Sequence, residues 1–262
     1  MLTRIVADEA AVGEAAAAIV ATAIGSHPPK APFLLGCPGG RSPRSTYRAL
    51  AVAADRERLD LSRVVIVMMD DYLDEGPDGR LTRVDPGAAH SCERFAREEI
   101  LRVVNASVPA RSRIRDEAIW LPDPDEPEGY DERIRQAGGV SLFLLASGAT
   151  DGHIAFNPPG SSRSSRTRTV TLAQTTRRDN LATFPSFGGD LAAVPRYGVS
   201  VGIGSIRDLS HRVVMVVHGS DKRLAARRLG SAVRYEQDWP ATIVAECAQA
   251  QLIVDRAAAG LS

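Results

Sequence analysis

Residues 140–153 read VSLFLLASGATDGH, an apolar run that ends abruptly in small, polar and acidic residues. Short apolar runs bounded by turn residues are typical of strands that a parallel sheet buries on both faces. The same pattern recurs in residues 32–36 (PFLLG), 64–69 (VVIVMM), 197–202 (YGVSVG), 213–217 (VVMVV) and 251–254 (QLIV). Helical patterns separate these runs, so the sequence predicts an α/β fold with a doubly wound, mostly parallel sheet and helices on both faces.

The segments between the apolar runs carry helix signals. Asp8 can cap a helix whose apolar residues recur at helical spacing until Gly25 stops it. Further helices are expected after Ser42, His90, Gly129, Ser220 and Trp239. Residues 122–129 and 185–190 are rich in Pro, Gly and Asp and predict loops that are too short to separate domains. We therefore expect residues 1–262 to form a single domain.

Composition limits the classes of partner. Basic and acidic residues both number 32, and aromatic residues make up 5% of the chain, so neither summed charge nor stacking surface favours nucleic acid. No apolar stretch approaches the roughly 20 residues of a membrane span, and the first residues do not resemble a secretion signal. The three cysteines, Cys37, Cys92 and Cys247, lack metal-type spacing and suit a reducing compartment. These features predict a cytoplasmic protein that binds a small molecule, and a homo-oligomer is compatible with them.

Polar residues follow the predicted strands, where open α/β sheets bind their ligands. After the first run, residues 36–43 (GCPGGRSP) combine glycines with the start of a helix, an arrangement that favours an anion. Gly39, Gly40, Arg41 and Ser42 are therefore candidate phosphate-binding residues. The alternative is an ordinary tight turn between a strand and a helix. The weaker glycine pattern at residues 198–204 is interpreted as a strand with close packing.

Asp70 and Asp71 directly follow the run VVIVMM, where we expect the chain to turn sharply. Burial beside apolar neighbours can raise the pKa of Asp70 and make it suitable for proton transfer. The alternative is that one of these aspartates only caps the next turn.

The third cluster places Asp151 two residues before His153. A carboxylate can fix the tautomer of an imidazole and favour its protonated form, so this pair can exchange protons near neutral pH. The alternative is that His153 has only a structural role. We assign no catalytic role to His27, His90, His211 or His218, although His90 could enter the pocket from a helix start.

These motifs resemble those of one known family. Residues 151–157 (DGHIAFN), the serines and arginines of residues 159–168 and the motif at residues 69–72 (MDDY) resemble the signature regions of glucosamine-6-phosphate deaminases. The resemblance extends to residues 38–43, 194–195, 200–204 and 219–222, so it covers most of the chain in order.

The resemblance implies roles for individual residues. An aspartate at the position of Asp70 moves a proton between C1 and C2 of the opened sugar, and His153, oriented by Asp151, assists ring opening. Lys222 and the turn from Gly39 to Ser42 hold the phosphate. No metal or organic cofactor is implied. The expected reaction is aldose-ketose isomerisation of a sugar phosphate, with or without deamination.

Four positions depart from the family pattern. Pro158 stands where the deaminases have a glutamate beside the acid and the histidine, and Ala182 replaces an arginine that clamps phosphate. Gly39 replaces a threonine and Val170 replaces a lysine of allosterically regulated members. Arg41, Arg177 and Arg178 are candidates to replace the lost charge. A 6-phosphogluconolactonase-like hydrolase and a non-catalytic sugar-phosphate-binding regulator remain alternatives.

Overall fold

The central sheet of the protein is entirely parallel. The computed structural model describes residues 1–261, without the side chain of Ala182. The sheet contains β1 (Leu2–Val6), β11 (Gln251–Asp255), β10 (Val213–Val217), β7 (Leu142–Ala146), β2 (Phe33–Cys37), β3 (Val64–Met68) and β6 (Ile119–Trp120), in that order. Every neighbouring pair runs parallel, which confirms the predicted sheet.

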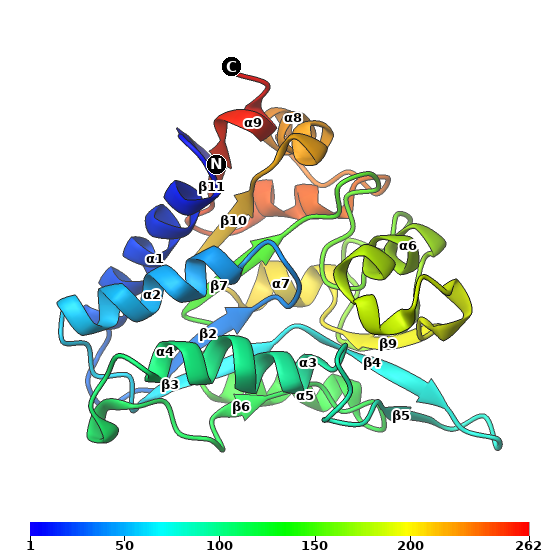
Figure 1. The fold of residues 1–262 in the computed structure, drawn as a ribbon, viewed down its shortest axis with the longest axis horizontal. Helices are drawn as coiled ribbons and strands as arrows, with labels where there is room; N and C mark the ends of the chain where they lie inside the picture. Colours follow the sequence, from blue (N-terminus) through cyan, green and yellow to red (C-terminus); the bar gives the residue numbers. More distant parts are fainter. Residues whose placement is uncertain (262) are drawn as a thin grey trace.

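Helices cover both faces of this sheet (Figure 1). The helices α1 (Glu9–Gly25) and α2 (Arg44–Arg56) pack against each other on one face. Beside them lies a continuous helical segment that consists of α3 (Cys92–Phe95), a π-helical turn (Ala96–Leu101) and α4 (Arg102–Asn105). The other helices are α5 (Pro127–Gln136), α6 (Gln174–Thr183), α7 (Ile203–Leu209), α8 (Arg223–Ser231) and α9 (Arg256–Ala259). In the described residues, no helix combines the length and apolar character needed to cross a membrane.

The cap of α1 forms as the sequence predicts. Asp8 Oδ1 accepts a hydrogen bond from the Ala11 backbone N–H at 2.9 Å, and the helix ends at Gly25. The helices expected after Ser42, His90 and Ser220 are also present. The helix expected after Trp239 is a 3₁₀ helix (Pro240–Glu246), and α5 starts at Pro127, before the expected Gly129, which shortens the predicted loop.

A second, antiparallel sheet is the main departure from the predicted fold. It consists of β5 (Leu81–Arg83), β4 (Asp70–Glu75), β9 (Tyr197–Ser200) and β8 (Arg168–Thr171). The prediction that the apolar run 197–202 joins the parallel sheet is wrong. Apolar content reports burial but does not reveal which sheet buries a strand.

The glycine pattern at residues 198–204 begins in β9 and ends in α7, so the predicted strand covers only its first part. The predicted close packing is confirmed, because an added Cβ at Gly198 or Gly202 would clash with Phe156 or Ser165, respectively.

The expected sharp turn after β3 is also wrong. A single residue, Met69, separates β3 from β4, and the chain continues as a strand that pairs Asp70 with Ser200. Tyr72 and Leu73 bury their side chains in this strand, so packing and cross-strand hydrogen bonds favour extension over a turn. The carboxyl end of β3 therefore leads directly from one sheet into the other.

The direction of winding reverses between β2 and β7. From β2 the chain moves through α2 to β3 on one side, whereas the connection from β7 leads to β10 on the other side. Ligands of open α/β sheets bind beyond the carboxyl ends of the strands at such a reversal. The turn at residues 38–43 and the segment at residues 147–153 both begin at this point.

Candidate active site

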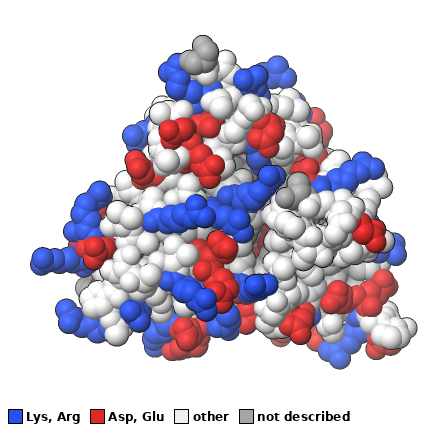
Figure 2. Space-filling view, viewed as in Figure 1, with Lys and Arg blue, Asp and Glu red and all other residues white. Residues whose placement is uncertain are grey.

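A cavity of about 610 Å³ lies beyond the carboxyl ends of β2, β3 and β7. It is bordered by seven of the eight candidate residues: Gly39, Gly40, Arg41, Ser42, Asp70, His153 and Lys222. The eighth, Asp151, is absent from the cavity wall and contacts His153 from behind. In Figure 2, lysine and arginine side chains gather beside a hollow in the middle of this face. Arg41, Arg44 and Arg48 are the arginines that border the cavity.

Asp70 begins β4 and is 6% exposed. Its Oδ1 accepts a hydrogen bond from the Cys92 Sγ at 3.5 Å. Burial is the main cause that raises the pKa of Asp70 to about 7, and the neighbouring Asp71 charge adds to it. The carboxylate is thus poised to gain or lose a proton near neutral pH.

Asp71 has a structural role instead. Its Oδ1 accepts hydrogen bonds from the backbone N–H groups of Tyr72 at 2.9 Å and Cys92 at 3.0 Å, which fixes the start of α3. It does not border the cavity. The capping alternative therefore holds for Asp71, whereas Asp70 faces the cavity.

Asp151 holds His153 in one orientation. Its Oδ1 accepts from the His153 Nδ1 at 2.7 Å and from the His153 backbone N–H at 3.1 Å, while Thr175 Oγ1 donates to its Oδ2 at 2.5 Å. Burial opposes ionisation of Asp151, but the hydrogen bonds from His153 and Thr175 outweigh it and hold its pKa well below the usual range. With Nδ1 engaged by a carboxylate, Nε2 is the ring nitrogen that remains for a ligand in the cavity.

The glycine turn is built to approach a ligand with its backbone. Gly40 has a φ of +83°, a conformation that favours glycine, and no atom lies near the position of an added Cβ. The turn is supported by the Tyr47 hydroxyl, which donates to the Pro38 carbonyl at 2.8 Å, and by His218 Nε2, which lies 3.1 Å from the Ser42 carbonyl oxygen. Helix α2 follows immediately, and no side chain caps its first turn. This combination suits a phosphate.

Lys222 is a basic residue that borders the cavity together with Arg41. It ends a short 3₁₀ helix (Ser220–Lys222), and its Nζ donates to the Ser147 carbonyl. Burial lowers the pKa of Lys222, although Asp221 and Asp179 oppose this effect. The remaining N–H donors of the ammonium group are available to an anion.

The sequence is similar to that of proteins of one known family. Over residues 7–254 the chain matches the family described as glucosamine-6-phosphate isomerases/6-phosphogluconolactonase. The chain belongs to this family. A glucosamine-6-phosphate deaminase from Beutenbergia cavernae is 35% identical over 251 residues, which cover 93% of this chain and 87% of the relative.

Solved structures show the same relationship. A structure described as a monomeric glucosamine-6-phosphate deaminase matches with a TM-score of 0.80 and 27% identity, and the match covers 100% of both chains. The 6-phosphogluconolactonase from Leishmania guyanensis matches with a TM-score of 0.69 and 17% identity, covering 98% of this chain and 97% of that one. The second likeness shows a shared fold alone.

The departures from the family pattern can now be placed. Pro158 is absent from the described cavity wall, so no side chain at this position faces a ligand. Arg177 Nη2 donates to the carbonyls of Leu191 at 2.6 Å and Val194 at 2.9 Å, and Arg178 does not border the cavity. Of the three arginines considered as replacements, Arg41 alone lies at the cavity. The Ala182 side chain lies outside the described part of the structure.

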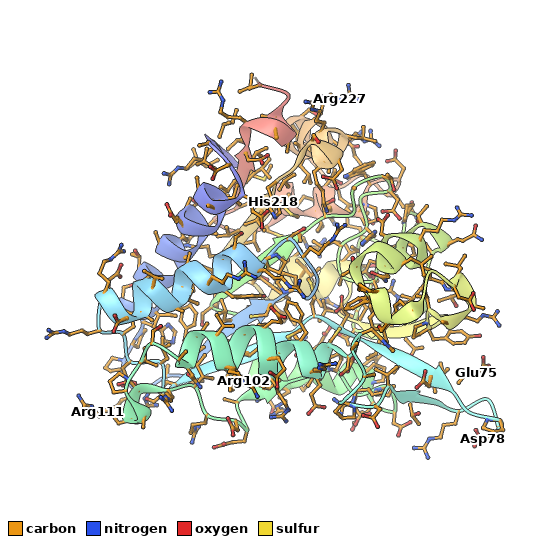
Figure 3. All side chains as sticks on the ribbon, in the orientation of Figure 1. Glu75, Asp78, Arg102, Arg111, His218 and Arg227 are labelled. Carbon is orange, nitrogen blue, oxygen red and sulfur yellow. The ribbon has the colours of Figure 1, made fainter. Side chains whose placement is uncertain are left out.

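Sequence reasoning missed the contribution of α6. This helix brings Thr176, Asp179, Asn180 and Thr183 to the cavity wall. The spacing of three and four residues between these positions was a usable signal of one polar helical face. His218 was also missed as a cavity residue, and Figure 3 places it near the centre of the molecule. His90 does not border the cavity and instead contacts the rings of Tyr72 and Phe187.

The buried charge of Asp70 predicts a pH-dependent effect on stability. Its folded pKa of about 7 exceeds the ordinary value of 3.8, so the folded protein holds this proton more tightly than the unfolded chain. Its unfavourable contribution to folding therefore grows as pH rises from about 4 to about 7. The difference of about three pKa units corresponds to about 4 kcal/mol, since one unit is about 1.4 kcal/mol. Because a buried amide also loses hydration, Asp70→Asn should be more stable than wild type by part of this amount, about 1 to 3 kcal/mol at pH 8. The gain should shrink towards pH 5, as measured by urea unfolding.

Asp71→Asn is the matched control for this prediction. Burial also raises the pKa of Asp71, to about 6, but its carboxylate accepts two backbone hydrogen bonds that the amide would weaken. A smaller gain, or a loss, is expected. A stability difference between Asp70→Asn and wild type that stays constant from pH 5 to pH 8 would contradict the assigned ionisation.

Proposed function

We propose that this protein is a sugar-phosphate aldose-ketose isomerase that acts as a deaminase on an amino-sugar phosphate of the glucosamine 6-phosphate type. The main support is that Asp70 and His153, which is held by Asp151, border the same cavity. The glycine turn of residues 39–42 and Lys222 border this cavity too. Two of the similar proteins are described as glucosamine-6-phosphate deaminases, which supports the same reaction. His153 and Asp70 each carry out one step, and the glycine turn and Lys222 hold the phosphate.

The first step opens the sugar ring. His153, held through Nδ1 by Asp151, uses Nε2 to move a proton between the ring oxygen and the C1 hydroxyl. Gly148 makes this arrangement compact, because its lack of a side chain leaves room for both partners. The product of the step is an open-chain aldehyde at C1.

The second step transfers a proton between carbons. The Asp70 carboxylate removes the proton from C2, which gives an enolamine, and returns it to C1, which gives an imine at C2. Water then adds to the imine and ammonia leaves, so that a ketose phosphate remains. A pKa of about 7 allows Asp70 both to accept and to return the proton near neutral pH.

A lactone hydrolase is the competing function. The absence of an acid at Pro158 favours it, since the related lactonases also lack this glutamate. Hydrolysis of a lactone, however, gives no role to a buried carboxylate that exchanges a proton with carbon. The position of Asp70 on the cavity wall therefore favours isomerisation over hydrolysis.

The functional test compares glucosamine 6-phosphate, neutral sugar phosphates and 6-phosphogluconolactone while ammonia and product are both followed. Release of ammonia together with a ketose phosphate supports the proposal. Lactone hydrolysis without isomerisation would assign the lactonase function instead. Tight binding of sugar phosphates without turnover of any of them would make the protein a sugar-phosphate-binding regulator.

Asp70→Asn should abolish the reaction but preserve ligand binding. The amide keeps the shape of the carboxylate but cannot accept a proton, so kcat should fall by about 10² to 10⁴, the usual contribution of a general base. Wild-type kcat/KM should rise with pH through an apparent pKa near 7. Turnover and calorimetric affinity are measured on the same preparations. Near-normal turnover of the variant would remove Asp70 from the mechanism.

Gly148→Ala should damage the acid-histidine pair. An added Cβ would lie 2.3 Å from the His153 Nδ1 and 2.4 Å from the Asp151 Oδ1, so the two side chains must move. We expect kcat/KM to fall by at least about 100-fold, because general acid-base catalysis depends on this geometry. Gly230→Ala is the control, since its Cβ meets no atom and its helix favours alanine. Retention of wild-type kcat/KM by Gly148→Ala would contradict the role of the pair.

Lys222→Met should weaken binding of phosphorylated ligands. The methionine keeps much of the apolar stem and deletes the charge, so affinity should fall by about 1.5 to 3 kcal/mol, the range for hydrogen bonds to charged groups. Lys30, the other lysine of the chain, is exposed and provides the control Lys30→Met. Phosphorylated and unphosphorylated sugars are titrated by calorimetry at constant salt. Equal wild-type affinity for both sugars would refute the sugar-phosphate substrate class.

A further inference from the structure

Asp179 is a carboxylate on the cavity wall that the mechanism above does not use. It lies in α6, is half-buried, and its side chain forms no hydrogen bond or ion pair with the other described residues. Burial raises its pKa, while the charges of His153, Lys222 and Arg41 oppose this effect. A partly desolvated carboxylate without a partner is unfavourable unless a ligand supplies a hydrogen-bond donor or a positive charge.

The position of Asp179 is fixed by contacts along α6 and the segment after it. Near the start of the helix, Thr175 donates to Asp151 and Thr176 Oγ1 lies 3.4 Å from His153 Nδ1. After its end, the Phe184 ring packs against the Tyr72 ring at a centroid distance of 6.2 Å. Asp179 lies between these anchors, so its carboxylate is held in a defined relation to His153.

A neighbouring side chain on the same helix also lacks a partner. The Asn180 Nδ2 is buried without a hydrogen-bond partner among the described residues, and Asn180 borders the same cavity. Two adjacent residues of α6 thus present an unused acceptor and an unused donor. Polar groups left in this state at a cavity wall are typical of a surface completed by a ligand.

The charges around the cavity indicate which part of a ligand meets Asp179. Phosphate is attracted to the side formed by Lys222, Arg41 and the glycine turn, and the reacting carbons must reach Asp70 and His153. Asp179 interacts electrostatically with His153 and also with Lys222 and Arg41, so a ligand that reaches both sets of residues comes close to the Asp179 carboxylate, which would repel the phosphate. The part of an amino-sugar phosphate that a carboxylate attracts is the ammonium group on C2, next to the reacting carbons.

We propose that Asp179 binds the C2 ammonium group of the substrate and makes the cavity selective for amino-sugar phosphates over neutral sugar phosphates. This inference rests on the proposed function and deepens it. Asp179 becomes a specificity-determining residue on α6, within electrostatic reach of both His153 and the cations Lys222 and Arg41. Asn180 supplies a donor to a neighbouring hydroxyl of the same ligand.

The test uses two unreactive open-chain ligands that differ in one group. In 2-amino-2-deoxyglucitol 6-phosphate and glucitol 6-phosphate, C1 is an alcohol, so neither can isomerise, and only the first carries an ammonium group. Wild type should bind the amino ligand about tenfold more tightly, as expected for one charge-assisted contact. In Asp179→Asn this preference should disappear through weaker binding of the amino ligand, with the neutral ligand unchanged or tighter.

Asp221→Asn is the matched control, because Asp221 is another carboxylate that borders the cavity and precedes Lys222 in the chain. It should change the affinity of both ligands by the same factor and preserve their ratio. Asp179→Glu should restore part of the preference. Circular dichroism and the affinity for inorganic phosphate check that each variant is folded, and Asp179→Ala provides a second variant if the amide destabilises α6.

The outcomes separate this inference from the proposed function. A preference that persists in Asp179→Asn, or an equal loss for both ligands, overturns the role of Asp179. Strong and equal wild-type affinity for the two ligands also overturns it but leaves a sugar-phosphate isomerase intact. Wild-type affinity for both ligands no better than for inorganic phosphate would overturn the proposed function itself.

Discussion

The contact between β2 and β7 determines where chemistry can occur in this protein. The two strands are neighbours in a parallel sheet, but the chain leaves them in opposite directions. Their connections therefore separate at the carboxyl edge and leave a space that neither fills. The glycine turn enters this space from β2, and the Asp151-His153 pair enters it from β7. Asp70 arrives at the same space because β3 lies next to β2 and continues directly into β4.

Most of this arrangement could be predicted from local sequence, because strand burial and turn chemistry are local properties. The runs at residues 32–36 and 140–146 are apolar at nearly every position, and the polar residues that follow them mark the carboxyl ends. The assignment of residues 197–202 failed because a strand of the antiparallel sheet is buried by partners distant in sequence. Asp70 shows the same limit, since cross-strand pairing with Ser200 replaced the turn that adjacent aspartates suggest.

The side chains contributed by α6 were harder to predict for another reason. Its residues Thr175 and Asp179 are ordinary in a helix, and their importance arises only because the helix lies against Asp151 and the cavity. Thr175 donates to the Asp151 oxygen that His153 leaves free. A neutral hydroxyl thus completes the coordination of this carboxylate in a chain that has proline at position 158. The acid-histidine pair consequently keeps its orientation without a second acid beside it.

Desolvation has opposite consequences for an acidic and a basic residue of the cavity wall. It raises the pKa of Asp70, which makes the carboxylate a stronger base, and it lowers the pKa of Lys222, which weakens the hold of that side chain on its proton. A phosphate arriving beside Lys222 favours the ammonium form and reverses this effect, so ligand binding and protonation of Lys222 reinforce each other. Arg41 brings another basic side chain to the same cavity wall. The same desolvation therefore makes Asp70 a better base and couples the charge of Lys222 to the arrival of an anion.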